Sequence, residues 1–218
     1  MALQTELAAQ NAWRAAHFPP DLRQAMELSI ASLKRAGWSE KALQVGDDFP
    51  ALELIDSAGA HFSLSRVLGR APLIVSFFCG HWSPYCNLEL RAFNALLPQI
   101  QALGARFVPI VGQDVELNVS TQRCNRLNYA LFSDPALKAA RACGLVMTLP
   151  DVMTDAMEQL GIDMPGYKPG TAYELPMPAS YLIDNQGKVV YAFADEDIRH
   201  RTEPEALLNA LQLLQTVR

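Results

Sequence analysis

The spacing of hydrophobic positions changes near residue 45. Before it, Ala- and Leu-rich stretches are typical of helices and are interrupted by a pair of prolines. Asp21 stands where it can cap a second helix that runs to about Arg35, and Gly37 is typical of the residue just after a helix. We therefore expect a helical extension over residues 1–44 that packs on the remainder of the chain or on a partner subunit.

From Val45 on, short β-type runs alternate with helical patterns. The predicted strands cover residues 73–79, 105–112, 180–184 and 188–194. The predicted helices cover residues 85–103, 115–126, a short part of 132–143, 152–160 and 203–217. A turn at Asn185-Gln186-Gly187 joins the last two strands into a hairpin. This order predicts one α/β domain over residues 45–218, with a mixed sheet.

Composition and charge exclude several classes of function. Half of the 218 residues are hydrophobic, so a domain of this size can bury a core without disulfides or a structural metal. A net charge of −5 argues against nucleic-acid binding, which favours a basic face. No apolar run approaches the roughly 18 residues that a membrane span needs. The first residues lack a secretory pattern, so we expect a cytoplasmic protein with reduced thiols.

The cysteines are the side chains whose types and positions point most clearly to a chemical role. Cys79, Cys86, Cys124 and Cys143 form no C-x-x-C pair, so a zinc site is not expected. No other motif points to a metal or a bound cofactor, and we expect neither. The remaining interpretations of these cysteines are thiol chemistry or burial in the core.

The segment around Cys86 favours thiol chemistry. Pro84 suits the first position of a helix and keeps Ser83 out of helical dihedral angles, as an N-cap requires. Ser83 is then the N-cap, and its hydroxyl reaches the backbone N–H of Cys86. In the first helical turn, unpaired N–H groups and the helix dipole favour an anion and so lower the pKa of the Cys86 thiol. The alternative is a buried cysteine in the apolar stripe continued by Leu90, Phe93, Leu97 and Ile100.

Several segments, in order along the chain, resemble one family. Trp82-Ser83-Pro84-Tyr85-Cys86-Asn87-Leu88-Glu89-Leu90 is similar to the active-site segment of the alkyl hydroperoxide reductase/thiol-specific antioxidant (AhpC/TSA) family, the peroxiredoxins, and especially to a branch with a W-C-P-Y-C-N-x-E-L signature. Residues 45–54, 132–135 and 178–187 resemble further family segments. The resemblance implies a thioredoxin-like fold, with a central mixed sheet flanked by helices.

The resemblance also implies an activity. Cys86 is expected to attack a hydroperoxide and become a sulfenic acid, while Ser83 bonds to the thiolate or the peroxide. Hydrogen peroxide or an organic hydroperoxide is the expected substrate, and an external thiol of the thioredoxin, glutaredoxin or glutathione type is the expected reductant. Trp82, Pro84 and Tyr85 are expected to support the site. No nucleic-acid or membrane partner is expected, and a homodimer is a further prediction.

The chain departs from the family pattern at informative positions. Ser83 replaces the first cysteine of the branch, and Cys79 stands where typical members have a proline. The arginine usually found before the strand that begins near Ser180 is absent, and Pro178 resembles the cis-proline that faces the cysteine in thioredoxins. These departures leave a second hypothesis, a redox sensor or a catalytically silent binding module on the same fold.

Other residues have weaker predicted roles. Cys124 is the preferred candidate for a resolving thiol, with Cys79 and Cys143 behind it. His81 is a candidate proton donor or an ordinary surface group. Arg199, His200 and Arg201 lie beside acidic residues and are predicted to form a solvated ion-pair patch.

Overall fold

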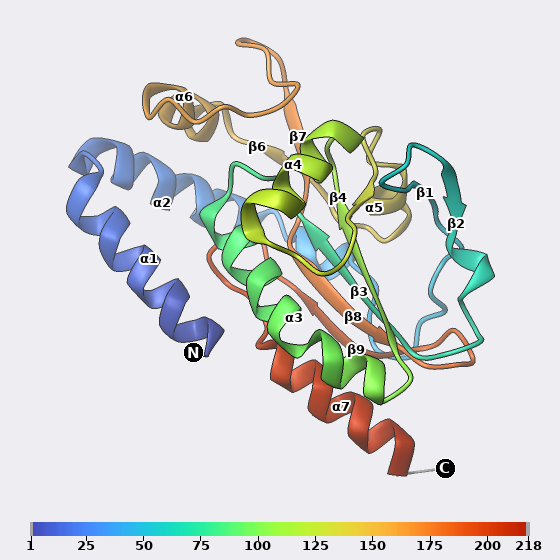
Figure 1. Cartoon of the computed structure of the whole chain (residues 1–218). Coiled ribbons are helices and arrows are strands. Elements are labelled where there is room, and N and C mark those ends of the chain that lie inside the picture. Colours follow the sequence, from blue (N-terminus) through green and yellow to red (C-terminus); the bar gives the residue numbers. More distant parts are fainter. Residues whose placement is uncertain (1, 217–218) are drawn as a thin grey trace.

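The computed structural model describes residues 2–216, which fold around one large sheet (Figure 1). The helices are α1 Leu3–His17, α2 Pro20–Arg35, α3 Pro84–Ala102, α4 Val115–Asn125, α5 Lys138–Ala142, α6 Asp151–Gln159 and α7 Pro204–Thr216, with short 3-10 turns at Trp38–Lys41 and Leu64–Arg66. The strands are β1 Glu53–Ile55, β2 His61–Ser63, β3 Leu73–Phe78, β4 Arg106–Val111, β5 Phe132–Ser133, β6 Val146–Leu149, β7 Tyr173–Pro176, β8 Ala179–Ile183 and β9 Val189–Ala194.

Seven strands form the main sheet in the order β2-β1-β5-β4-β3-β8-β9. The central strand β3 pairs in parallel with β4 and antiparallel with β8, so the predicted mixed sheet is confirmed. Every residue of β3 is buried, as expected for a strand whose continuous hydrophobic run is covered on both faces. The predicted hairpin is also confirmed, as β8 and β9.

Residues of β3 and β8 alternate between two covered faces. Ser76 lies opposite Ser180 and their hydroxyls are 2.8 Å apart, on the face that α3 and α7 cover (Figure 1). Tyr181, one residue further along β8, points to the opposite face, where its ring packs against Phe49 at 5.7 Å. Helix α3 therefore packs on one face of the sheet, and the end of β3 lies next to the start of that helix.

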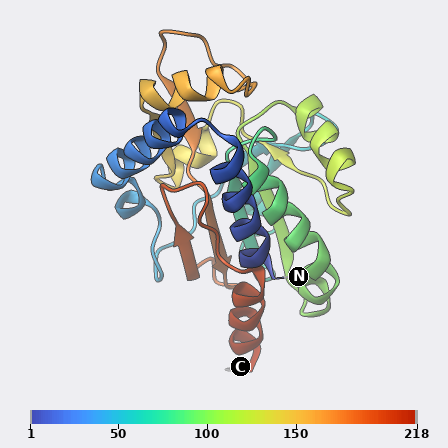
Figure 2. The same cartoon turned by 90° about the vertical axis from the view of Figure 1, so that its left-hand side faces the viewer.

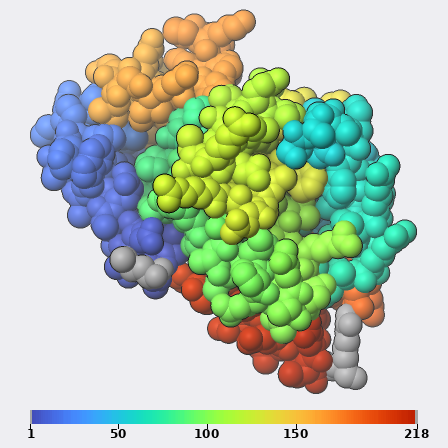
Figure 3. All heavy atoms as spheres, viewed as in Figure 1, coloured from blue at the N-terminus to red at the C-terminus, as the bar shows by residue number. Residues whose placement is uncertain are grey.

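The two N-terminal helices lie on the outside of this core. Leu3 and Leu7 of α1 pack against Tyr85 at the beginning of α3, as the side-by-side helices in Figure 2 show. Helix α2 packs against α6, and the space-filling view shows both along one edge of the molecule (Figure 3). The helices predicted before residue 45 are thus confirmed, and they pack on the chain itself; the domain boundary drawn there remains a prediction.

Some predicted details are wrong. Pro19, not Asp21, is at the N-cap position of α2; Asp21 lies within the first turn and makes no capping bond, because the helix begins two residues earlier than predicted. Gly37 does follow α2, in the left-handed conformation predicted by its type (φ 62°). The last residue of the predicted C-terminal helix, Val217, lies outside the described residues.

A second, two-stranded sheet of β6 and β7 was not predicted. Only Met177 and Pro178 separate β7 from β8, so the extended chain passes directly from one sheet to the other. The cis bond expected at Pro178 is therefore wrong: residues 2–216 contain no cis peptide, because this crossing has no tight turn for one to form. Across the same residues, no helix combines the length and apolarity that a membrane span requires.

Candidate active site

The β3–α3 junction places Cys86 inside the molecule. Ser83 has the extended dihedral angles of an N-cap (φ −84°, ψ 115°), and its hydroxyl accepts the Cys86 N–H at 3.4 Å. Pro84 is the first helical residue, as predicted. Neither Ser83 nor Cys86 has any exposed surface. The local geometry predicted for this segment is confirmed, and the predicted apolar stripe at Leu90, Phe93, Leu97 and Ile100 is buried on the same helix.

The surroundings of the Cys86 sulfur favour the thiolate. Burial by itself raises the pKa of Cys86, but a hydrogen bond from the Cys79 thiol and the positive charge of Arg201 outweigh it. Hydrogen bonds from the Ser83 hydroxyl and the Gly80 backbone N–H act in the same direction. The pKa of Cys86 therefore lies well below that of an ordinary thiol. The Cys79 thiol has the opposite shift, because its hydrogen bond to Cys86 and its burial raise its pKa.

Arg201 is the residue that sequence reasoning misplaced. Its Nη2 lies 3.4 Å from the Cys86 sulfur, and its side chain has no exposed surface. The prediction of a solvated patch at this position is wrong, because the segment after β9 turns Arg201 inward under α3. Arg201 thus brings a guanidinium to the Cys86 sulfur from a different part of the chain than the position before β8.

Glu89 is the second residue that the sequence did not reveal. It lies three residues after Cys86 on α3, and its Oε2 is 2.6 Å from Arg201 Nε. The two side chains are in close contact, but the Arg201 Nε–H does not point directly at the Glu89 oxygen. Burial raises the pKa of Glu89 to about 8, against the lowering effect of Arg201. The i, i+3 spacing from Cys86 is the one signal that could have placed Glu89 on the same helix face.

The segment that carries Arg201 is held by the N-terminal helices. The Glu203 carboxylate accepts the backbone N–H groups of Leu3 and Gln4 at 3.2 and 2.8 Å, and so caps α1. The side chain of Gln4 donates to the Arg201 carbonyl at 2.8 Å. These bonds hold the backbone at Arg201 and just after it, so the extension contributes to the site through the arginine.

A cluster of ion pairs holds the residues just before Arg201. Arg199 pairs with Asp197 at 2.7 Å and with Glu27 of α2 at 2.5 Å. Arg14 of α1 also reaches Glu27, at 2.6 Å. His200 lies 2.8 Å from Asp195. The predicted ion-pair patch therefore exists around residues 199 and 200, and only its third member is buried.

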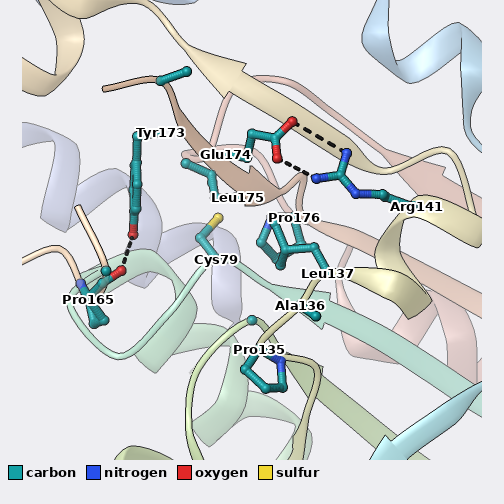
Figure 4. A pocket seen from close by; sticks show the side chains of 13 residues that line it. Cys79, Pro135, Ala136, Leu137, Arg141, Pro165, Tyr173, Glu174, Leu175 and Pro176 are labelled. Atoms are coloured by element: carbon teal, nitrogen blue, oxygen red, sulfur yellow. Dashed lines mark hydrogen bonds and ion pairs between the residues drawn. The ribbon is translucent and has the colours of Figure 1, made fainter. Parts of the chain in front are cut away.

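A pocket of about 360 Å³ ends at Cys79. It is formed by the loop before α5, by α5 itself, by β7 and by the segment that precedes β7. Figure 4 shows the Cys79 sulfur directed towards Leu175 and Pro176, with Tyr173 at one side. An ion pair between Arg141 and Glu174 stands at the pocket (Figure 4). Cys86 is not among the lining residues of this pocket.

The other predicted site residues lie around the junction in different environments. Trp82 and Tyr85 line a small apolar hollow against α1, α2 and α6, and the Tyr85 hydroxyl donates to Asn11 at 2.7 Å. Pro178 is buried, and its carbonyl accepts the Asp195 N–H at 3.3 Å. The supporting role predicted for Trp82, Tyr85 and Pro178 stays a prediction.

The remaining cysteines and His81 are placed apart from the Cys86 sulfur. Cys124 is exposed on α4, in a surface hollow that His81 and Asn87 also line. Cys143 is in the core, where burial raises its pKa. The His81 backbone N–H donates to Gln113 at 2.9 Å. The resolving role of Cys124 and the proton-donor role of His81 stay predictions.

Comparison with known proteins places this site in a family. The model of the AhpC/TSA family matches residues 45–192, more than half of the chain and including the whole β3–α3 junction. The chain belongs to the AhpC/TSA family. Among curated relatives, a chloroplastic peroxiredoxin Q of Populus jackii is 29% identical over 117 residues, which cover 52% of this chain and 54% of that protein. The match thus spans about half the length of this relative.

Solved structures support the fold assignment within this family. The peroxidoxin BcpB of Mycobacterium tuberculosis has a TM-score of 0.60 at 20% identity, covering 78% of this chain and 97% of that one. Peroxiredoxin Q of Xanthomonas campestris has a TM-score of 0.58 at 21% identity, covering 79% and 98%. These likenesses confirm the predicted thioredoxin-like fold for this AhpC/TSA member.

Proposed function

We propose that the chain is a thiol-dependent peroxidase that uses Cys86 as its nucleophile. The observation that carries the proposal is the Arg201 guanidinium 3.4 Å from a Cys86 sulfur that lies at a helix N-terminus. A buried cation and aligned hydrogen-bond donors keep a thiolate that an apolar core would protonate. Membership of the AhpC/TSA family and relatives that are named peroxiredoxins support the same activity.

In the proposed reaction, the Cys86 thiolate attacks the terminal oxygen of a hydroperoxide. A sulfur–oxygen bond forms, the oxygen–oxygen bond breaks, and the departing alkoxide or hydroxide takes a proton to leave as alcohol or water. The sulfur is oxidised to a sulfenic acid and the peroxide is reduced. Arg201 stabilises the negative charge as it moves from sulfur to oxygen, and Ser83 donates a hydrogen bond at the same sulfur.

A thiol must then restore Cys86, and we propose an external reductant of the thioredoxin, glutaredoxin or glutathione type. The AhpC/TSA assignment supports this class of partner. The predicted homodimer and the cytoplasmic location stay predictions. Sedimentation of the purified chain tests the first, and fractionation of the source cells tests the second.

The proposal is tested by treating the full chain with one equivalent of hydrogen peroxide in the presence of a sulfenic-acid trap. We expect rapid trapping at Cys86 in the wild type, none in Cys86→Ser, and wild-type behaviour in Cys143→Ala, which removes a buried cysteine elsewhere in the core. Continued peroxide consumption with a thiol reductant completes the support. Oxidation without turnover contradicts the peroxidase and favours a sensor, and an unmodified Cys86 favours a silent module.

A further inference from the structure

Two buried thiols meet at the end of β3, and the peroxidase chemistry uses only one of them. Cys79 follows the last residue of β3 directly, and Cys86 is the third residue of α3. The Gly80 N–H, one peptide bond from Cys79, donates to the Cys86 sulfur, and the Cys79 thiol donates to the same sulfur. Both cysteines are thus held against each other by the loop that joins strand to helix.

The joining loop has little freedom to separate them. Its Ser83 N–H bonds the Gly80 carbonyl at 3.2 Å, closing a turn between the two cysteines. A Cβ on Gly80 would lie 2.7 Å from the Trp82 indole nitrogen, so any larger residue here would force the Trp82 ring to move. Asn87 closes the turn from the helix side by donating to the His81 and Ser83 carbonyls at 2.8 and 3.0 Å. The closed turn and the hydrogen bond between the two thiols therefore keep Cys79 and Cys86 close together, which a disulfide between them requires.

We propose that Cys79 is the resolving thiol of this chain and that its sulfur is the one an external thiol attacks. The inference rests on the proposed peroxidase function, since the peroxide step supplies the oxidant. The Cys86 sulfenic acid condenses with the Cys79 thiol: the sulfur–oxygen bond breaks, a Cys79–Cys86 disulfide forms, and the hydroxyl group leaves with the Cys79 proton as water. The exposed Cys124 is not needed for this step.

The pocket in Figure 4 explains how the disulfide is reduced. Its wall includes the Cys79 sulfur and excludes Cys86, so a thiol that enters meets Cys79 first. The thiolate of the entering reductant forms a disulfide with Cys79, and the Cys79–Cys86 bond breaks to release Cys86 as a thiolate. A second reductant thiol then attacks this mixed disulfide, which releases Cys79 and leaves the reductant as a disulfide. A thiol of low pKa is the better leaving group, and the pKa of Cys86 is the lower of the two.

The test is peptide mapping of the full chain after one equivalent of hydrogen peroxide, with free thiols alkylated before trypsin digestion. Residues 71–91 carry both Cys79 and Cys86, and residues 124–126 carry Cys124. We expect peptide 71–91 to lose the mass of two hydrogen atoms and to resist alkylation in the wild type and in the matched variant Cys124→Ser. In Cys79→Ser we expect this loss to disappear and a trapped sulfenic acid to accumulate at Cys86.

The wild-type map alone decides the proposal, even where Cys79→Ser folds poorly. A stable Cys86 sulfenic acid beside an alkylated Cys79, or a link between peptides 71–91 and 124–126, overturns the pairing and leaves the peroxidase standing. Peroxide that leaves every cysteine alkylatable overturns the peroxidase itself, and the pairing with it. Adding glutathione to the oxidised chain and trapping the mixed disulfide then tests the site of attack: glutathione bound to Cys79 supports attack at Cys79, and glutathione bound to Cys86 contradicts it.

Discussion

The two segments that meet at the Cys86 sulfur are built in different ways. Residues 83–86 obtain their conformation from their own sequence, because Pro84 starts the helix and Ser83 caps it. The segment around Arg201 has no regular structure of its own and is held by residues far away in the chain, among them Glu27 and Gln4. One half of the site is therefore set by local rules of helix formation, and the other half by tertiary contacts.

This difference indicates which groups lower the pKa of Cys86. A helix N-terminus with its cap is found in many proteins and by itself favours an anion only moderately. The buried guanidinium adds a full charge where solvent does not screen it. The segment after β9 therefore adds a charge effect on the pKa of Cys86 that the local half of the site does not contain, beside the hydrogen bonds from Cys79, Ser83 and Gly80. Variants can separate the two contributions.

The largest effect is expected from Arg201→Met. It leaves the Glu89 carboxyl buried without its partner, which we expect to lower the free energy of unfolding by about 3 kcal/mol. Adding Glu89→Leu should restore most of that stability but not the low pKa of Cys86, because the positive charge is still absent. Urea unfolding measures the first quantity and the ultraviolet absorbance of the thiolate against pH measures the second. A double variant that keeps a low Cys86 pKa contradicts the role given to Arg201.

The next effect is a pH dependence set by Glu89. Its pKa is raised to about 8 in the folded chain, against about 4.3 in an unfolded one. Between these two pH values the folded state binds a proton that the unfolded state has lost, and this stabilises the folded state. The contribution is complete below pH about 4.3. It is lost as the pH rises through 8, by at most about 1.4 kcal/mol per pH unit.

Glu89→Gln should lack this loss, so the difference in unfolding free energy between wild type and variant should change across that window and become constant above it. Urea unfolding of both proteins at a series of pH values measures the difference. A difference that does not vary with pH shows that Glu89 is already ionised at neutral pH.

A smaller effect is expected from Ser83→Ala, which tests the local half of the site. Loss of an N-cap costs about 1 kcal/mol, and the thiolate loses one donor, so the pKa of Cys86 should rise. Thermal unfolding and thiolate titration measure the two changes. Ser57→Ala, at an exposed turn, is the control and should alter neither. An unchanged Cys86 pKa in Ser83→Ala assigns the whole shift to other groups.

The smallest effect is expected from Glu203→Gln, which weakens the cap of α1. We expect a loss of about 0.5 kcal/mol and faster amide hydrogen exchange in the first turn of α1, with a slight rise in the Cys86 pKa. The matched control is Glu205→Gln, an exposed carboxylate in the first turn of α7. Equal exchange in both variants contradicts the link between α1 and the Arg201 segment.

The same contrast explains how much the sequence could predict. The strands with long hydrophobic runs, the capped helix at Pro84 and the hairpin at Gly187 follow from local patterns and were predicted within a few residues. Strands β1, β5 and β6 have two to four residues and depend on their neighbours for pairing, so no pattern marks them. Arg201 looks like Arg199 in the sequence, and only packing under α3 makes one buried and the other part of a surface cluster.

Arg201 is 115 residues further along the chain than the sulfur it contacts. Cys86 is therefore synthesised long before Arg201, whose positive charge helps to keep it ionised. A nascent chain that ends anywhere between the two carries a Cys86 without its guanidinium, and its thiol stays closer to the ordinary, mostly protonated state. The contact between Arg201 and the Cys86 sulfur thus forms only after residue 201 has been made, when the sheet that encloses Cys86 has all its strands.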